Sequence, residues 1–254
     1  MEQKSREIKS GGFVLRVVQA QEADLIVRLL TSKGEKISAF ARAGLKSRKR
    51  FGGALEPLNY IVFRATKKSD NQELYYLEEA QSRNDFSVMK ADMDLLGAAT
   101  YLTELVENGA HEGLEHVEIF NLYGAGLKAL DSRALCAEGI VRQFEIKLLS
   151  LLGWLPGFQK CENCGRFSVP LTLNPDSGHV TCADCGKYTV AVSLEAQKVI
   201  KESLGTSISA GKLDKPAAEC LARITHVLFR PHLGNKPLKS AQFMSSLRSF
   251  KKET

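Results

Sequence analysis

Four of the six cysteines in the sequence fall into two short pairs. Two residues separate Cys161 from Cys164, two separate Cys182 from Cys185, and seventeen residues lie between the pairs. Each C-x₂-C turn lets two thiolates converge on one point, and two such turns supply the four sulfur ligands of a tetrahedral zinc site. The spacing therefore predicts one Zn²⁺ per chain, with disulfides or a redox C-x-x-C pair as the alternatives.

Four thiolates would close the coordination shell and leave no position for water or substrate. Such a zinc ion is structural rather than catalytic, and its binding is coupled to folding of the surrounding loops. We expect these loops to form a zinc-binding insert over residues 158–192. His179 is a possible substitute ligand, although a surface loop position is the simpler interpretation. Cys136 and Cys220 lie in apolar helical patterns, which favours buried packing over chemistry.

The N-terminal part of the chain, before this insert, is rich in β-forming residues. Five runs of Val, Ile, Leu, Phe and Tyr predict strands at Phe13–Ala20, Asp24–Thr31, Lys36–Ala43, Tyr60–Thr66 and Glu73–Ala80. Five strands in so short a stretch suit a small closed barrel, because closure removes exposed edges. We predict a five-stranded OB-fold, a nucleic-acid-binding domain, over residues 1–80, although the strands alone leave an SH3-like barrel open.

The segment between the third and fourth expected strands is strongly basic. From Lys36 to Leu55 there are six basic residues and no acidic residue. Its glycines would let the loop follow a phosphate backbone, and Phe51 is placed to stack on a base. The alternative is a solvated basic loop with Phe51 packed beneath it. The candidate DNA-binding residues are Arg42, Lys46, Arg48, Lys49, Arg50 and Phe51.

From Arg83 onward the apolar residues recur with a helical period, which predicts an α-helical domain over residues 81–254. We expect helices over 95–106, 117–130, 137–151, 193–203 and 216–229, with a last helix near 243–250. Pro231 and Gly234 are expected to end the fifth of these. The fold class is therefore α+β and multidomain: an OB-fold barrel followed by a helical domain that the cysteine-rich insert interrupts.

The net charge of +6 is unevenly placed. Residues 1–80 carry a net charge of +5, residues 81–160 carry −4, and residues 161–254 carry +5. Two positive regions on either side of an acidic one suggest a polyanion partner, although an ordinary solvated surface has the same pattern. No run of eighteen apolar residues occurs and the first ten residues are polar, so we expect neither a membrane span nor a signal peptide. Paired thiols without export fit the reducing cytoplasm.

The order of several short segments resembles the bacterial RecO family of recombination mediators. The segments are GFVL at 12–15, LLT at 29–31 with GEKI at 34–37, FGGALEP at 51–57, FEIKLLSLLGW at 144–154, the four cysteines, and LGNKPLKS at 233–240. The sequence departs from the family where a Lys-Gly-Ala-Arg run is usual. Arg42-Ala43-Gly44-Leu45 stands there, and the positive charge moves to residues 46–50.

This resemblance implies a DNA-binding protein of recombinational DNA repair. It implies binding to single- and double-stranded DNA, annealing of complementary strands, and work with RecR, sometimes RecF, in loading RecA onto single strands covered by single-stranded-DNA-binding protein. It implies a nucleoid-associated protein of the cytoplasm. In some family members the helical domain binds the acidic, apolar C-terminal tail of the single-stranded-DNA-binding protein.

For that tail, the resemblance and the basic C-terminal stretch suggest a partner-binding set of Arg142, Arg230, Lys236 and Lys239. Arg142 matches one of two arginines that the family often carries before the Phe-Glu of the long helix. The alternative for Arg142 is an ordinary helix-surface ion pair with Glu138 or Glu145, at helical spacing along the chain.

Two other functional classes remain open. An RNA-binding protein with an OB-fold and a zinc ribbon would have the same features, because base stacking and phosphate contacts serve both nucleic acids. A nucleic-acid-processing enzyme is less consistent with the sequence. No P-loop, nucleotidyl-transfer lysine motif or close acidic pair on a strand is apparent, and Asp92 and Asp94 suit a helix N-terminus. We therefore expect that the protein is not an enzyme.

Overall fold

The computed structural model describes residues 6–67, 69, 73–110, 116–132, 137–186, 188–208, 213–233 and 238–240. The chain divides into two compact units. The first contains residues 1–90 and 103–121, and the second contains residues 91–102 and 122–254. The domain limits expected from the sequence, at residue 80 and at 158–192, remain predictions.

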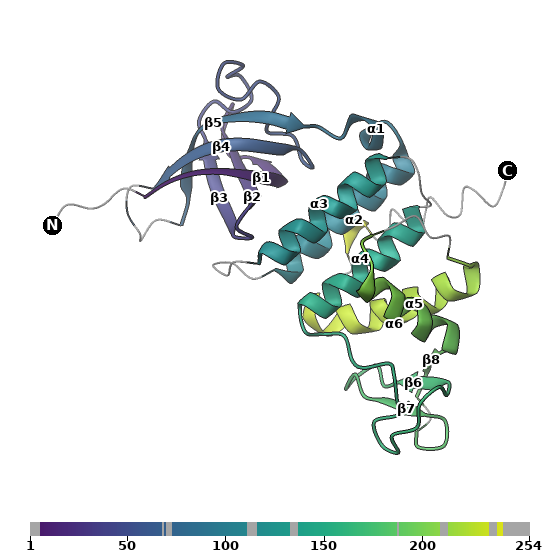
Figure 1. The fold of residues 1–254 in the computed structure, drawn as a ribbon. Helices are drawn as coiled ribbons and strands as arrows, with labels where there is room; N and C mark the ends of the chain where they lie inside the picture. The colour runs from purple at the N-terminus through teal and green to yellow at the C-terminus, as the bar shows by residue number, and fades with distance from the viewer. Residues whose placement is uncertain are drawn as a thin grey trace. The chain divides into compact units, whose positions relative to one another are not determined.

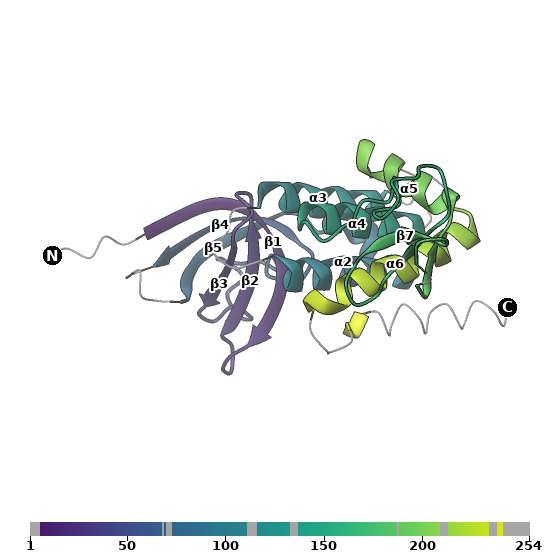
Figure 2. The ribbon, with the colours of Figure 1, turned by 90° about the horizontal axis from the view of Figure 1, so that it is seen from below.

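Five strands of the first unit form a closed barrel with the strand order β1-β2-β3-β5-β4 (Figures 1 and 2). They are β1 (Arg6–Gln19), β2 (Leu25–Thr31), β3 (Lys36–Ala41), β4 (Tyr60–Lys67) and β5 (Tyr75–Asn84). Neighbouring strands are antiparallel except for β3 and β5, which pair in parallel. This closed order confirms the OB-fold predicted from the sequence, and it leaves no strand edge unpaired.

The barrel is filled by apolar side chains that alternate along the strands. Along β2, for example, Leu25, Val27 and Leu29 are buried inside the barrel. Strand β1 begins seven residues earlier than predicted, because its polar first half pairs with β4 although it lacks a clear apolar pattern. Strand β3 ends at Ala41, two residues earlier than predicted, because Ala43 has a left-handed backbone with φ 52°.

Helices α1 (Ser87–Lys90), α2 (Met93–Gly109) and α3 (Val117–Asp131) follow the barrel in the sequence. Within the first unit, three cationic side chains of the barrel strands contact Glu107, near the end of α2. Lys36 Nζ donates to its backbone carbonyl at 2.6 Å, and Arg16 and Arg28 lie 3.9 and 3.7 Å from its carboxylate. Positive charge stabilises a helix C-terminus, so these three cations stabilise the end of α2. They pair with Glu107 of the protein itself, unlike the exposed cations of the β3–β4 loop.

The helix starts carry the side-chain caps that their residue types favour. Asp92 Oδ1 accepts hydrogen bonds from the backbone N–H groups of Asp94 and Leu95 at 2.9 and 3.2 Å. Ser193 Oγ accepts one from Ala196 N–H at 3.1 Å and caps α5. Both caps satisfy N–H groups that have no partner within the helix, and both agree with the helix starts expected from the sequence.

The second unit contains α4 (Ala137–Leu151), α5 (Leu194–Gly205) and α6 (Lys215–Leu233), and α4 packs against both α5 and α6. Gly126 of α3 also lies in this unit. A Cβ atom added there would be 3.0 Å from Leu102 and 3.1 Å from Phe144, so the missing side chain permits close packing with α2 and α4. Gly126 therefore helps helix packing, although in the sequence it weakens the helical pattern.

Helix α6 differs from its prediction at the C-terminal end. It runs through Pro231 and ends at Leu233, whereas Pro231 was expected to end it. Pro231 removes one N–H donor from the helix, and only two helical residues follow it, so little helix beyond the proline has to be maintained. The last helix expected near 243–250 lies outside the described residues.

Between α4 and α5 the chain forms a small three-stranded antiparallel sheet with the order β7-β6-β8 (Figure 1). Its strands are β6 (Leu171–Leu173), β7 (Val180–Cys182) and β8 (Val190–Val192). Strand β8 packs against α6, which attaches this cysteine-rich sheet to the helices of the second unit. In the described part of the chain, no helix has the length and apolar character needed to cross a membrane.

Candidate nucleic-acid interface and metal centre

The basic loop between β3 and β4 is built on a tight turn at Ala43. The Asp24 carboxylate accepts a hydrogen bond from Ala43 N–H at 2.6 Å, which holds the left-handed backbone of that residue. The Ala43 carbonyl in turn accepts from the N–H groups of Lys46 and Ser47 at 3.1 and 2.9 Å. Such strained positions recur where a fold must present side chains in one geometry. The turn fixes the backbone from which the following cationic side chains extend.

Arg50 supports this loop from inside. Its Nε donates to Ser47 Oγ at 3.0 Å, its Nη2 contacts the Arg42 carbonyl, and its guanidinium lies 4.8 Å from the centroid of the Phe51 ring. Its backbone carbonyl accepts from Ala80 N–H on β5 at 2.9 Å. Of the five predicted loop cations, Arg50 is therefore the one whose first role is structural.

The other four predicted cations, Arg42, Lys46, Arg48 and Lys49, are exposed. They lie within eight residues of one another on a loop whose backbone is tied to Asp24 and to β5. Exposed lysine and arginine side chains at this density can pair with successive phosphate groups of a nucleic acid. The loop thus presents an exposed positive surface on a barrel of the OB type.

Phe51 is buried rather than presented to solvent. Its side chain is 2% exposed and belongs to the barrel core with Ala54, Leu55 and their neighbours. The prediction that Phe51 stacks on a base is therefore corrected, and its alternative, a ring packed beneath the loop, describes the structure. Leu45 is the exposed apolar side chain of this loop, at 59%. Local pattern does not decide which of Leu45 and Phe51 is buried, because both residues are apolar and lie within the same basic run.

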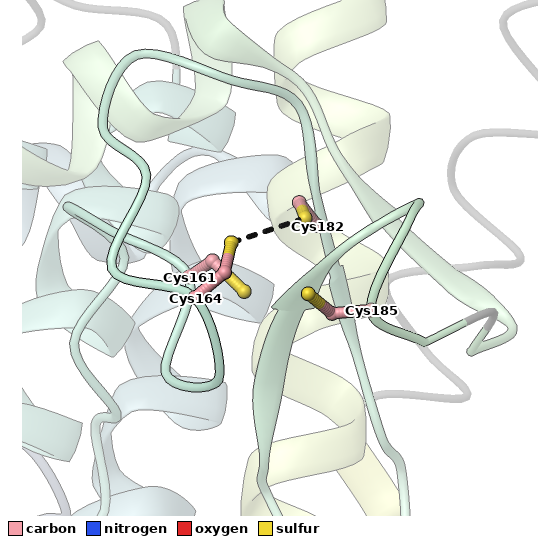
Figure 3. A group of neighbouring side chains, drawn as sticks. All are labelled: Cys161, Cys164, Cys182 and Cys185. Atoms are coloured by element: carbon pink, nitrogen blue, oxygen red, sulfur yellow. Dashed lines mark hydrogen bonds between the residues drawn. The ribbon is translucent and has the colours of Figure 1, made fainter.

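The four paired cysteines converge as their spacing predicts. The Sγ atoms of Cys161, Cys164, Cys182 and Cys185 all lie within 4.8 Å of one another, and they point together from two separate turns (Figure 3). Cys161 and Cys182 are buried, whereas Cys164 is exposed. Four sulfur atoms at this separation form a donor set that can hold one metal ion. The arrangement of the four cysteines therefore fits a bound metal ion.

The pKa values of the thiols in the two turns shift in opposite directions. The backbone amide of Cys164 lowers the pKa of the Cys161 thiol to about 6. The backbone amide of Arg166 lowers the pKa of the Cys164 thiol. The hydrogen bond that Cys185 shares with Cys164 raises the pKa of the Cys185 thiol to about 12. Thiolates are the form that binds a metal, so the N–H groups of the first turn stabilise the ligand form.

Side chains around the cysteines join the two turns without entering the donor set. Arg166 Nη1 donates to Asp184 Oδ2 at 2.7 Å, and this bond links a residue two positions after the first pair to a residue within the second. His179 contacts the Glu162 carboxylate and lies 3.0 Å from Asn163 Oδ1. His179 is thus a loop residue that packs on the first turn. Cys220 is buried in α6 and donates to the Ala191 carbonyl, while Cys136 lies outside the described residues.

Arg142, the first of the predicted partner-binding residues, is buried in the second unit. Its Nη1 lies 2.6 Å from Glu145 Oε2 and 3.3 Å from Thr225 Oγ1, and its side chain is 9% exposed. The structure corrects the tail-binding prediction for this side chain, since the guanidinium is enclosed. It supports the ion pair with Glu145, in the interior rather than on the surface. Arg230 and Lys239 are exposed, and Lys236 lies outside the described residues.

Comparison with protein families covers both parts of the chain. The family model "Recombination protein O N terminal" matches residues 4–86, and "Recombination protein O C terminal" matches residues 90–242. The chain belongs to the RecO family. The resemblance drawn from the short segments of the sequence is thereby confirmed, and the OB-type barrel lies within the N-terminal RecO match.

Several curated relatives carry the name "DNA repair protein RecO". The relative from Anaeromyxobacter dehalogenans (strain 2CP-C) is 35% identical over 158 residues, or 62% of this chain and 61% of the relative. That from Alkaliphilus metalliredigens (strain QYMF) is 32% identical over 161 residues, covering 63% and 64%. A RecO protein of Symbiobacterium thermophilum is 30% identical over 247 residues, covering 94% and 96%. The chain thus spans about three fifths of the length of the first RecO relative and nearly all of the last.

Proposed function

We propose that the protein is a DNA-binding mediator of recombinational DNA repair. It would anneal complementary single strands and help to load RecA onto single-stranded DNA covered by single-stranded-DNA-binding protein. Membership of the RecO family and the name "DNA repair protein RecO" of its relatives support this role. The proposed site of action is the nucleoid, in the cytoplasm.

The observation that carries the proposal is the exposed cation cluster on the β3–β4 loop. Arg42, Lys46, Arg48 and Lys49 are exposed, and Arg50 and the turn at Ala43 hold the loop that presents them. Contacts to phosphate are independent of base sequence, which suits a protein that must act on any broken chromosome. Annealing needs binding of this kind and no chemical step, so the proposal is of a non-enzymatic protein.

In this proposal the four cysteines hold one structural Zn²⁺. A complete set of four thiolates leaves no position for substrate, and zinc favours four tetrahedral sulfur ligands. The ion would stabilise the short β6–β8 sheet, whose strands have only three residues each. Strands of that length have little core of their own, so metal binding and folding of this segment would be coupled.

The proposed protein partners follow the family. They are RecR, in some cases RecF, and the acidic, apolar C-terminal tail of the single-stranded-DNA-binding protein. Burial removes Arg142 from the proposed tail contacts. The exposed cations Arg230 and Lys239 of the C-terminal region remain in the proposed set.

Salt-dependent binding tests the DNA-binding claim. Fluorescence anisotropy with a labelled oligonucleotide should show affinity falling with salt, by a log–log slope of about 0.7 per single-strand phosphate contact. Replacing Lys46, Arg48 and Lys49 together by alanine should reduce that slope, whereas replacing Lys9 and Lys33, exposed elsewhere on the barrel, should change it much less. An unchanged slope in the triple variant would contradict the proposal.

The second candidate function is RNA binding by the same loop, because phosphate contacts do not separate the two nucleic acids. Competition between DNA and RNA oligonucleotides of matched sequence distinguishes them. The proposed role predicts that DNA displaces labelled DNA at lower concentration than RNA does. Stronger displacement by RNA would favour the second candidate.

A further inference from the structure

The first cysteine turn forms a small hairpin of its own, from Lys160 to Phe167. Its two end residues pair as an isolated β-bridge, and Cys161 N–H donates to the Arg166 carbonyl at 2.9 Å. The second turn is anchored differently, because Cys182 is the last residue of β7 and pairs with β6. The two halves of the cysteine site thus belong to separate pieces of local structure, and their relative position sets the distances between the four sulfur atoms.

Glu162 lies between the first two cysteines and joins the hairpin to the sheet. Its Oε2 accepts a hydrogen bond from Val180 N–H at 3.1 Å and contacts the His179 ring. Its own N–H donates to the Val180 carbonyl at 3.0 Å. Asn163 Oδ1 lies 3.0 Å from His179 Nε2. Both residues between the first two cysteines are therefore connected to the start of β7.

Arg166 joins the same hairpin to the second cysteine turn. Its Nη1 lies 2.7 Å from Oδ2 of Asp184, which stands between Cys182 and Cys185. The two side chains are 55% and 69% exposed, and so exposed an ion pair adds little to the free energy of unfolding. Its place in the structure is the informative feature, because it connects the two segments that carry the sulfur ligands.

Arg166 also brings positive charge to the sulfur atoms. The hydrogen bond with Asp184, and after it one with the Cys164 sulfur, raises the pKa of the guanidinium above its ordinary value. Cys164 is the exposed cysteine of the four. Four thiolates carry more negative charge than one divalent ion neutralises, and a guanidinium beside the most exposed of them offsets part of the excess.

We propose that Glu162 and Arg166 are positioning residues of the metal site, which hold the two cysteine turns together and thereby raise the affinity of the site for Zn²⁺. Groups that orient metal ligands typically contribute a factor of about 10–100 to metal affinity. The inference rests on the proposed zinc binding, but it concerns side chains outside the set of four sulfur ligands. Variants of these residues should bind zinc more weakly while all four sulfur ligands remain.

The first measurement is the zinc affinity of the full-length protein, obtained by titrating the zinc-loaded chain with a chelator of known affinity. Glu162→Ala and Arg166→Ala should each weaken zinc binding about tenfold or more, and the double variant should be weaker than either. Arg166→Lys keeps the positive charge without the guanidinium fork, so it should bind zinc more tightly than Arg166→Ala. Unchanged affinities in both alanine variants would overturn the proposal.

Cobalt substitution separates a positioning residue from a lost ligand. Co²⁺ occupies tetrahedral thiolate sites, and its visible absorption reports how many sulfur atoms bind it. The cobalt forms of Glu162→Ala and Arg166→Ala should have the absorption of the wild-type protein, whereas Cys164→Ser should lose the four-sulfur spectrum. A four-sulfur spectrum missing from the two alanine variants would contradict a positioning role. Wild-type protein that bound neither metal would overturn the metal site itself.

Matched controls separate position from overall charge. Asp176→Ala removes an exposed carboxylate of the same insert, and Lys198→Ala removes an exposed cation of α5. Both should leave zinc affinity unchanged. Loss of a cation by itself draws Zn²⁺ closer, so general electrostatics would tighten the site in Arg166→Ala rather than weaken it. Losses in the two controls as large as those in Glu162→Ala and Arg166→Ala, with thermal melting showing each zinc-loaded protein folded, would overturn the assignment.

Discussion

The Arg142 guanidinium lies 2.6 Å from the Glu145 carboxylate, and the two side chains are 9% and 1% exposed. Thr225 Oγ1 donates to the same carboxylate oxygen at 2.8 Å, and Tyr101 OH donates to the other at 2.5 Å. The network joins α2, α4 and α6 within the second unit. A buried charge is tolerated when it is paired and hydrogen-bonded, so these groups depend on one another.

Arg142→Ala should therefore destabilise the protein strongly. Removing the cation leaves Glu145 buried without its counter-charge, which typically costs about 3–5 kcal/mol of unfolding free energy. Urea denaturation of both proteins measures the loss. The matched control is Arg230→Ala, an exposed arginine of the same unit, whose effect should stay within about 0.5 kcal/mol. A stable Arg142→Ala protein would contradict the structural role of this residue.

Phe51→Ala should destabilise the barrel rather than act on DNA alone. The ring is 2% exposed within the core, and replacing a buried phenylalanine by alanine typically costs about 3–5 kcal/mol. The control is Leu45→Ala, which removes an exposed apolar side chain of the same loop and should have little effect on stability. If Phe51→Ala kept full stability and lost affinity for single strands, the ring would be a stacking platform after all.

Zinc removal tests the metal centre. Freshly purified protein should contain about one Zn²⁺ per chain by elemental analysis, and a strong chelator should lower its melting temperature. Cys182→Ala should bind less zinc and be less stable. Cys220→Ala, which alters a buried cysteine outside the cluster, should keep its zinc. Metal-free wild-type protein that melts at an unchanged temperature would refute a structural ion.

The pair formed by Trp154 and His232 should respond to pH. The two rings are stacked with centroids 3.9 Å apart, Trp154 is the sole tryptophan, and burial lowers the pKa of His232. Because the folded state binds this proton less readily than the unfolded chain, the contribution of His232 to stability is present above about pH 6.5 and lost as the pH falls.

Tryptophan fluorescence provides the measurement for this pair, because a protonated imidazole quenches a neighbouring indole. Emission should fall on acidification with a midpoint below about 6.5, the ordinary value for histidine. His232→Gln should remove that step. A midpoint above the ordinary value, or a step that persists in the variant, would contradict the lowered pKa.

Local pattern was enough to predict much of this structure. The apolar runs of the first eighty residues gave the five strands because each forms one wall of the barrel core. Ser193 at the start of α5 and the paired cysteine spacing were equally direct signals, since a cap and a C-x₂-C turn involve only neighbours in the sequence.

The predictions that were wrong concern residues whose burial or pairing depends on a contact with a distant part of the sequence. Arg142 has the spacing of a helix-surface ion pair, but Thr225, 83 residues later, helps to enclose it. Phe51 and Leu45 are both apolar residues of one basic loop, and only the barrel core determines which is buried. The first half of β1 is polar, and its pairing with β4 supplies the order that its side chains do not predict.

Annealing of two complementary oligonucleotides, followed by fluorescence energy transfer, measures the proposed mediator activity itself. We expect the wild-type protein to accelerate annealing without ATP, also when the strands are covered by single-stranded-DNA-binding protein. The triple alanine variant of Lys46, Arg48 and Lys49 should anneal bare strands markedly more slowly while remaining folded. Annealing no faster than the spontaneous reaction, or equal rates for wild type and variant, would contradict a mediator that acts through the β3–β4 loop.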